Sequence, residues 1–550
     1  MYFRNGLAAV AAALAAGALV VPAAGSAAVG SSTHQRLDAK VPEFLGHYQH
    51  VVVLYEENHS FDNLYGRWGD VGGDHLDGLA AAPRRHTLQV AQDGSPYRCL
   101  PQDDVNLTSP PLASTCHDAA HGVPDSRFTN RPFTIDHYIA PSDKTCPAPG
   151  VFAENGVLKN SPGARPGGCT RDLVHRFYQE QYQINGGRQN RYVTGSDAIG
   201  LTMGTYATRR LPVYRYLHSA GAPHYVIADR FFQGAHGGSF LNHQWLIAGR
   251  APVDSSHGKL GAEHSVIDAN GMPTTYPEYT PTRTDVVDGQ LTRVCPGGSV
   301  SNYKLACGDF AVNTVQPSNP PFKAGDPQIG LIDDKRYPNI GDRLTAKGIS
   351  WNWYAGGWHD AAAGNPGPLF QYHHQPFNYY AAYAPGQPGR THLKGEAGFF
   401  KAARSGHLPT VSFVKPYGAE NEHPGYASAT DGDRHLVKLI KAVLNGPQAS
   451  STLVIVTYDE FGGQWDHVPP PGPGSPTPGP SDAFGPGTRI PALFVAATMH
   501  RSGVDHRSYD TTSIIASMER SFGLRPVGIR DTRVNSLRHV LSVGGVSKHR

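Results

Sequence analysis

Six short, continuously apolar runs are the feature that most constrains the fold of this chain. Their apolar residues follow one another without polar alternation, which is typical of strands buried on both faces of a parallel sheet. Segments with helical periodicity lie between them, and strands that alternate with helices indicate an α/β fold. We therefore expect strands at 50–56, 224–229, 349–354, 410–415, 452–459 and 490–497, and helices within 196–221, 433–446 and 511–523.

Length and charge limit the remaining possibilities. The chain has 550 residues, enough to bury a sizeable core. Its formal net charge of +3 is too small to suggest a nucleic-acid partner. Two stretches rich in Pro, Gly, Asp and Thr, near 67–170 and 251–330, interrupt the alternation of strands and helices. We expect them to be insertions, or a cap over the sheet edge, in a single domain that covers 29–550. We expect 469–480 to be a Pro/Gly loop.

The first 28 residues have the pattern of a secretory signal peptide. Arg4 precedes the apolar run "GLAAVAAALAAGALVV", and small residues follow it up to a predicted cleavage site near Ala28. The alternative is an uncleaved membrane anchor. No later run is long enough to span a bilayer. The sequence thus predicts a secreted, periplasmic or cell-surface protein.

Six cysteines fit an exported chain, and all of them lie in the two interrupting stretches. Pairing of sequence neighbours would staple three local loops, although six thiols allow 15 pairings. The alternative is free or metal-bound thiols, and the absence of a CxxC motif speaks against a zinc-thiolate site. The predicted disulfides are Cys99–Cys116, Cys146–Cys169 and Cys295–Cys307.

Polar side chains follow three of the predicted strands. Glu57 and Asn58 follow the first, Ser239 lies in a Gly-rich turn after the second, and Asp459 and Glu460 end the strand at 452–459. Ligands bind at the carboxyl ends of the strands in open α/β sheets, so these groups are expected to meet. Carboxylate and amide oxygens suit a divalent ion. The alternative is that these residues only cap helices.

The stretch "HGGSF" at 236–240 can hold an anion. Its glycines allow close approach of the backbone, and amides at a helix start bind negative charge. Ser239 can then attack phosphorus, whereas the plain alternative is a Gly-Gly-Ser turn. Histidines can bind phosphate oxygens or protonate a leaving group, although a lone His is usually structural. The candidates are His175, His373, His374, His423 and, with Asp466, His467.

The motifs "EENHSFDNLYG", "DRFFQGAHGGSFLNHQW", "NEHPGY" and "YDEFGGQWDHVPPP" resemble those of the bacterial phosphoesterase family. That family contains secreted phospholipases C and acid phosphatases and belongs to the alkaline phosphatase-like superfamily. The resemblance implies an α/β, mostly parallel central sheet covered by helices on both faces, with disulfide-stapled loop insertions. It implies one divalent metal ion held by Glu57, Asn58, Ser239, Asp459 and Glu460. Oxygen ligands suit Ca, Mg or Mn, whereas a contributing His would favour Zn or Fe. It places His175, His373, His374 and His423 around the phosphate, with Ser239 as nucleophile.

Three functions follow from this resemblance. The first is a secreted phosphatase that hydrolyses phosphate monoesters through a phosphoserine, because "GGSFLNHQW" departs from the stretch typical of the phospholipases. The second is a phospholipase C that cleaves phospholipid head groups, and the third is a binding protein for metal or phosphate without turnover. Ser60 and Asp62 are expected to cap the turn after the first strand, above Phe61 and Tyr65, and Glu56 to support the site or be exposed.

Overall fold

The computed structural model describes residues 48–101, 114–137, 141–142, 172–251, 266–272, 275–282, 284–287, 291–292, 299–300, 303–304, 310–311, 331–425 and 427–546. All of them belong to one compact unit, Val41–Arg550. Residues 1–28 lie outside the described ranges, so the signal peptide stays a prediction.

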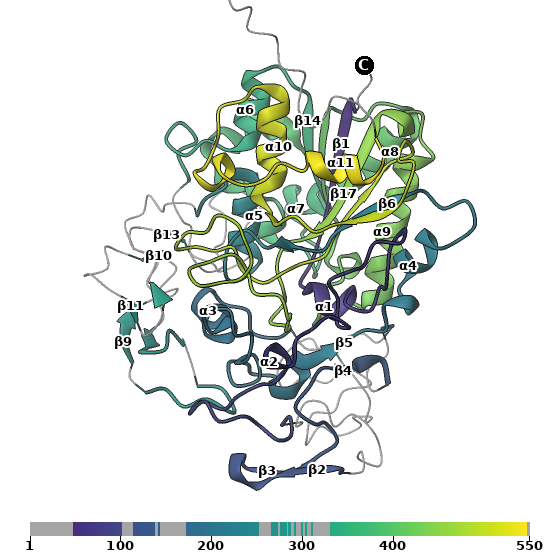
Figure 1. Cartoon of the computed structure of the whole chain (residues 1–550). Coiled ribbons are helices and arrows are strands. Elements are labelled where there is room, and N and C mark those ends of the chain that lie inside the picture. The colour runs from purple at the N-terminus through teal and green to yellow at the C-terminus, as the bar shows by residue number, and fades with distance from the viewer. Residues whose placement is uncertain are drawn as a thin grey trace, which may run out of the picture. The chain divides into compact units, whose positions relative to one another are not determined.

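An eight-stranded sheet forms the centre of this unit (Figure 1). In spatial order its strands are β15 (Leu393–Gly395), β14 (Trp351–Ala355), β16 (Val411–Lys415), β1 (His50–Glu56), β17 (Thr452–Tyr458), β18 (Ala492–Val495), β6 (Tyr225–Ala228) and β19 (Gly503–Asp505). All six predicted strands are confirmed, with ends within two residues of those expected. The sequence missed only the two edge strands, which are three residues each and therefore too short to show a pattern.

The sheet is mostly parallel, as predicted, but the expectation of a parallel strand at 490–497 is wrong, because β18 runs antiparallel to both of its neighbours. The other pairings in this sheet are parallel. The loop from β17 to β18 begins and ends at the same end of these two neighbouring strands. The strand β18 must therefore run in the direction opposite to β17. A central strand is buried in either direction, and its apolar run therefore does not reveal which direction it takes.

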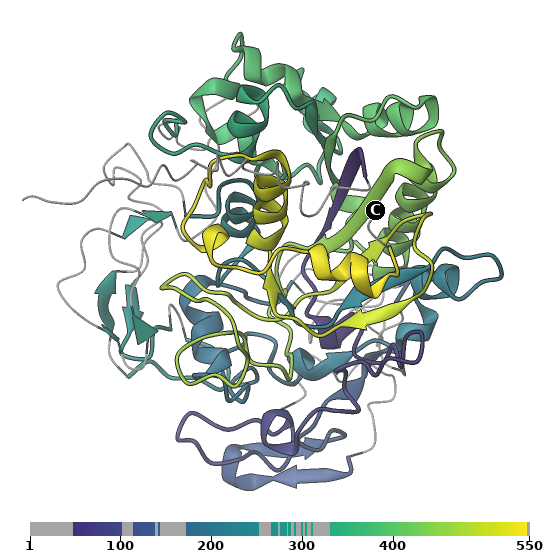
Figure 2. The same cartoon turned by 45° about the horizontal axis from the view of Figure 1, so that its top comes forward.

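Helices cover both faces of the sheet, as predicted (Figures 1 and 2). On one face lie α4 (Pro212–Leu217), α8 (Glu396–Ser405) and α9 (Ala429–Leu444). On the other lie α5 (Ser239–Ala248), α6 (Ile340–Ala346) and α10 (Thr512–Phe522). Figure 2 shows α10 in yellow and α9 in green on opposite sides of the purple β1. The helices predicted within 433–446 and 511–523 are confirmed as α9 and α10.

The helix predicted within 196–221 is broken. A 3₁₀ turn covers Ile199–Met203, the strand β5 (Gly204–Thr205) follows, and α4 begins only at Pro212. Gly204 packs against Ile135, where an added Cβ would lie 2.9 Å from Ile135 Cδ1. Pro212 has no N–H to continue a helix from the preceding turn and fits only at a first helical position. Apolar periodicity alone hides both interruptions.

The remaining elements are short. The helices are α1 (Phe61–Leu64), α2 (Arg84–Thr87), α3 (Phe177–Ile184), α7 (Trp358–Ala362) and α11 (Arg538–Val543). The strands are β2 (Cys116–Asp118), β3 (Val123–Ser126), β4 (Phe133–Thr134), β7 (Phe231–Phe232), β8 (Val266–Asp268), β9 (Thr284–Val287), β10 (Leu291–Thr292), β11 (Ser299–Val300), β12 (Tyr303–Lys304), β13 (Phe310–Ala311) and β20 (Tyr509–Asp510).

The interrupting stretches add no strand to the central sheet in their described parts. The predicted disulfide Cys99–Cys116 is confirmed and ties β2 to the chain before it. The pairs Cys146–Cys169 and Cys295–Cys307 lie outside the described residues. The loop 469–480 has no regular structure, as expected. Within the described ranges, no helix is both long and apolar enough to cross a bilayer.

Candidate active site

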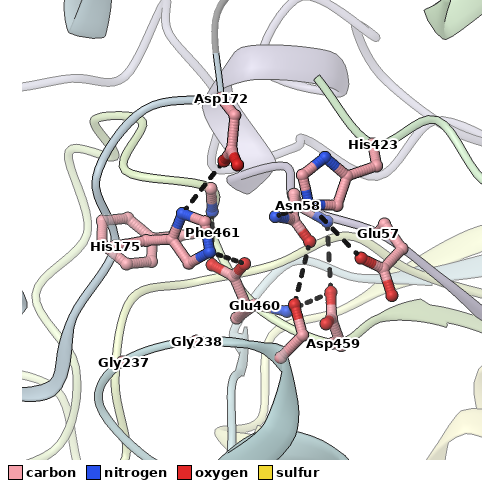
Figure 3. A network of polar contacts seen from close by, with 12 residues as sticks. Glu57, Asn58, Asp172, His175, Gly237, Gly238, His423, Asp459, Glu460 and Phe461 are labelled. Atoms are coloured by element: carbon pink, nitrogen blue, oxygen red, sulfur yellow. Dashed lines mark hydrogen bonds and ion pairs between the residues drawn. The ribbon is translucent and has the colours of Figure 1, made fainter. Parts of the chain in front are cut away.

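The ends of β1 and β17 bring together two polar pairs that are far apart in sequence. The two strands pair in register, with Glu56 opposite Tyr458. Beyond that point the Asn58 N–H donates to Asp459 Oδ1 at 3.1 Å, and Glu57 and Glu460 lie beside them (Figure 3). All four side chains are fully buried. The juxtaposition expected at the carboxyl edge of the sheet therefore exists.

Ser239 is the first residue of α5 and lies directly at these groups. Its Oγ donates to Asn58 Oδ1 at 3.4 Å and is also hydrogen-bonded to Asp459. The preceding glycines make this approach possible. Gly237 has φ +94° and Gly238 lies against His175, where an added Cβ would meet Cδ2 at 3.1 Å. The start of α5 thus presents its unbonded amides beside a hydroxyl and a group of carboxylates.

Three of the four predicted histidines contact these groups directly. His374 Nε2 lies 2.7 Å from Glu57 Oε1. His423 Nε2 accepts from Asn58 Nδ2 at 2.9 Å while its Nδ1 donates to the Pro424 carbonyl. This hydrogen bond fixes the tautomer and leaves Nε2 turned toward the site.

His175 lies on the side of the site opposite to His423, as Figure 3 shows. Its Nε2 lies 3.4 Å from Glu460 Oε1, and its Nδ1 faces Leu173 O at 2.6 Å and Asp172 Oδ1 at 3.5 Å. His373 is half-buried and its ring packs edge-on against His374, with centroids 4.7 Å apart. The structure therefore brings all four histidines to one place.

Sequence reasoning missed two residues here. His243 lies one helical turn after Ser239, donates Nδ1–H to the Ser239 carbonyl at 2.7 Å and stacks on His374 at 5.4 Å. Lys415 ends β16, is fully buried and forms an ion pair with Glu57. A charged residue that closes an apolar strand, and a histidine four positions after the serine, were the signals available.

One of the smaller expectations needs correction. Ser60 caps α1 by accepting from the Asn63 N–H at 3.2 Å, as predicted. Asp62 is not a cap, because it lies inside α1. For Glu56, full burial excludes exposure and leaves the other expectation, support of the site; burial raises its pKa to about 8.

Asp62 instead belongs to a second buried network, with Asp466, His467 and Arg489. Arg489 contacts Asp466 Oδ1 at 3.0 Å and Asp62 Oδ1 at 3.1 Å. His467 Nδ1 donates to Asp62 Oδ2 at 2.6 Å. A guanidinium thus already supplies the positive charge between the two carboxylates, so we assign this cluster to holding the first and last motifs together rather than to a metal.

Burial and neighbouring charge separate the acids of the site. Burial alone would raise the pKa of Glu57, but the charges of His374 and Lys415 hold it well below its usual value. Burial and the charge of Glu57 raise the pKa of Asp459 to about 7. Burial and the charge of Asp459 raise the pKa of Glu460 well above its usual value. Crowded carboxylates of this kind favour an added cation.

The donor set fits a divalent metal ion. Asp459 Oδ2 is buried and accepts no hydrogen bond from the described residues. Ligand atoms of Glu57, His243 and Asp459 lie within 4.8 Å of one another. The oxygens of Asn58 and Ser239 adjoin this group. Carboxylate, amide and hydroxyl oxygens are the donors that hard divalent ions prefer, and buried carboxylates need such a partner.

Two strained residues frame the site. Asn58 has φ +57° and Glu422 has φ +71°. Both residues lie in the left-handed region of backbone angles that residues other than Gly rarely adopt. Their loops are joined, since the Glu57 N–H donates to Asn421 O at 3.0 Å and His59 Nε2 lies 3.1 Å from Glu422 O. Such strain persists only where the surroundings fix it, and it is common at active sites.

Comparison with known proteins identifies the family of this chain. A sequence model described as "Phosphoesterase family" matches residues 152–525, which include Ser239, Asp459 and Glu460. Phospholipase C B of Mycobacterium tuberculosis is 23% identical over 509 residues, which are 88% of this chain and 75% of that protein. The non-hemolytic phospholipase C of Burkholderia pseudomallei is 31% identical over 224 residues. That match covers 35% of this chain and only 30% of the relative's own length.

Solved structures are more distant. A Vibrio parahaemolyticus protein in the alkaline phosphatase superfamily is 11% identical, with a TM-score of 0.24. The overlay covers 36% of this chain and 52% of that one. A TM-score this low supports no structural inference.

Proposed function

Since the chain belongs to the Phosphoesterase family, we propose that it hydrolyses phosphoric esters. Ser239 attacks phosphorus, and cleavage passes through a covalent phosphoserine. The observation that carries this proposal is the place of Ser239 Oγ. It lies at the start of α5, within 3.4 Å of Asn58 Oδ1 and hydrogen-bonded to Asp459. A nucleophile beside helix-terminal amides and carboxylates fits phosphoryl transfer.

The proposed reaction has two displacements. Ser239 Oγ bonds to phosphorus while its proton passes to Asp459, and the bond from phosphorus to the leaving oxygen breaks. His175, the most exposed histidine in contact with the acids, protonates that oxygen. Water then gives a proton to His175 and attacks phosphorus, and the Oγ–phosphorus bond breaks as Oγ regains its proton. The amides at the start of α5 stabilise the equatorial oxygens.

We further propose one divalent ion, held by Glu57, Asn58, Asp459, Glu460 and Ser239. When bound, it polarises the phosphate and the serine hydroxyl. The net charge of these buried side chains supports one divalent ion rather than two. The three buried carboxylates carry −3 when ionised, and Lys415 supplies +1, so −2 remains for a single divalent ion. The all-oxygen set favours calcium, magnesium or manganese, whereas ligation by His243 would favour zinc or iron.

Phosphodiesters of the phospholipid type are the substrate class that we propose first, because the similar proteins named above are phospholipases C. This reverses the order that the sequence motifs favoured. One observation keeps phosphate monoesters as a second candidate for the substrate class. Ile529 is the single large apolar side chain exposed among the described residues, so this part of the chain shows no apolar rim for a lipid surface.

The test compares p-nitrophenylphosphorylcholine with p-nitrophenyl phosphate, for wild type and Ser239→Ala, with and without a chelator. We expect faster turnover of the choline ester, lost by about 10³-fold or more in the variant and on chelation. Ser405→Ala, which removes an exposed hydroxyl on α8, is the matched control and should be fully active. Faster turnover of the monoester would instead establish a phosphatase.

Two other results would refute parts of the proposal. Full activity in Ser239→Ala would exclude this nucleophile. If metal-loaded wild type binds phosphate but turns over neither ester, the chain is a binding protein. We also propose export, and the N-terminal sequence of the protein from its natural host tests this: a chain that begins at Met1 contradicts cleavage near Ala28.

A further inference from the structure

Glu180 is a fully buried carboxylate that the proposed reaction does not use. It lies on α3 (Phe177–Ile184), the helix that begins two residues after His175. The nearest basic group is His236, whose Nδ1 is 4.0 Å from Glu180 Oε1. Burial of a carboxylate without a close cation is costly, so strong hydrogen bonds must replace water around it.

Four hydrogen bonds do so, and they come from two separate segments. Oε2 accepts from the Gly237 N–H at 2.5 Å and from Gln233 Nε2 at 2.9 Å. Oε1 accepts from the Thr488 N–H at 2.7 Å and from Thr488 Oγ1 at 2.9 Å. The Gly487 backbone also lies so close that an added Cβ would meet Oε1 at 2.5 Å. One carboxylate therefore fastens the loop before Ser239 to the chain at 487–488.

The first of these hydrogen bonds orients the serine loop. The Gly237 N–H points to Glu180, while the Gly237 carbonyl accepts from Asn242 Nδ2 at 3.1 Å. Both polar groups of this residue are thus fixed, two positions before Ser239. With φ +94° and no Cβ, Gly237 has wide conformational freedom, so its hydrogen bonds must select one conformation.

Gln233 connects Glu180 to the loop that carries the acidic pair Asp459 and Glu460. Its Nε2 donates to Glu180, and its Oε1 accepts from the Phe461 N–H at 3.0 Å, one residue beyond Glu460. The same side-chain amide therefore contacts the carboxylate of Glu180 and the loop that bears Asp459 and Glu460. Gln233 thus forms a bridge that links Glu180 to the loop that bears these carboxylates.

We propose that Glu180 is a positioning residue that fixes Ser239 relative to Asp459 and Glu460. This inference rests on the proposed function, since it assumes that Ser239 attacks phosphorus. Glu180→Gln replaces one acceptor oxygen by an NH₂ group, which must then face the N–H of Gly237 or of Thr488. The loop has to move to relieve that contact. A shift of about 1 Å at a reacting atom costs about 10²-fold in rate.

The experiment measures kcat and KM of Glu180→Gln with p-nitrophenylphosphorylcholine at 10 °C, together with the thermal midpoint and metal content. We expect kcat to fall by about 10–100-fold with KM within about threefold. Gln181→Ala is the control, because among the described residues Gln181 Nε2 donates only within its own helix, to the Phe177 carbonyl. Thr488→Val, which keeps the N–H and loses one donor, should lose less than about threefold.

Several outcomes would overturn the inference. A merely structural Glu180 would lower the thermal midpoint while folded enzyme keeps wild-type kcat at 10 °C. Should Glu180→Gln fail to fold, Gln233→Leu breaks the same bridge without adding charge, and wild-type kcat there refutes the proposal. Wild-type activity in Ser239→Ala defeats the proposed function and this inference together. An inactive Ser239→Ala beside a fully active Glu180→Gln defeats the inference alone.

Discussion

Lys415 and Glu57 form an ion pair that is fully buried, at the point where β16 and β1 end side by side. The ammonium group also donates to the Glu56 carbonyl at 3.0 Å and lies 5.1 Å from the centre of the Tyr55 ring. A fixed cation of the protein and the proposed metal ion therefore share one carboxylate. We therefore expect the stability of the fold and the affinity for metal to be coupled through Glu57.

Lys415→Met tests this coupling. Breaking a buried ion pair by removing one partner costs about 3–5 kcal/mol. We expect that loss of unfolding free energy in the presence of a chelator. Saturating divalent ion should restore a large part of it, because the ion supplies the missing positive charge. Denaturant unfolding with and without metal measures both values, and an equal loss in the two conditions contradicts the coupling.

Arg489 should be irreplaceable by lysine. Its guanidinium contacts Asp62 and Asp466 and also donates to the carbonyls of Asp77 and Asp229, at 2.6 and 2.8 Å. A lysine ammonium cannot reproduce this planar set of donors. Arg489→Met should lose about 3–5 kcal/mol of unfolding free energy, and Arg489→Lys should recover less than half. Arg501→Lys, at an exposed site, is the control for denaturant unfolding. Wild-type stability in Arg489→Lys would contradict the role assigned to the guanidinium.

His467 should make stability depend on pH. Burial would lower its pKa, but the charge and hydrogen bond of Asp62 raise it to about 9. The folded state therefore binds the proton more tightly than the unfolded state, whose pKa is about 6.5. The resulting stabilisation is complete below pH 6.5 and is lost as pH rises through 9.

We accordingly expect wild type to lose up to about 3 kcal/mol relative to His467→Gln between pH 6.5 and 9. Unfolding free energies of both proteins across that range give the difference. Parallel pH profiles would show that His467 is not the group responsible.

Glu519 provides a separate pH effect, on α10. Burial and the charge of Asp531 raise its pKa to about 9. Stability is therefore full below the unfolded pKa and falls as pH rises toward 9. Glu519→Gln removes the ionisable group and keeps an oxygen for the Val527 N–H, which donates to Oε1 at 3.0 Å. The variant should match wild type at pH 5 and exceed it by at least about 1 kcal/mol at pH 9. A lower stability than wild type at pH 9 would refute the raised pKa.

Much of the sheet and the candidate site was predictable because burial and local order leave traces in the sequence. The continuous apolar run of β17 shows a strand covered on both faces, and Asp459 and Glu460 stand where it must end. The direction of β18 left no such trace, since it depends on where the preceding loop returns.

Residues that act through tertiary contacts were the ones missed. Lys415 resembles a polar strand end, and Glu180 resembles one of several polar residues on α3, until the fold shows what each contacts. The local sequence predicts a cap at Asp62, whereas its partners are Asp466, His467 and Arg489, more than 400 positions later. Contacts across hundreds of residues have no local signature, and short-range patterns therefore cannot reveal them.

The position of β1 has a consequence for the order in which the protein matures. The Asn58 N–H and Asp459 Oδ1 are joined across 401 positions of the chain. During synthesis the first strand must wait for both of its neighbours, β16 and β17, which emerge from the ribosome far later. Closing so long a loop is slow compared with forming helices. The proposed metal ion can therefore be captured only near the end of folding, and a prematurely terminated chain would lack the proposed site altogether.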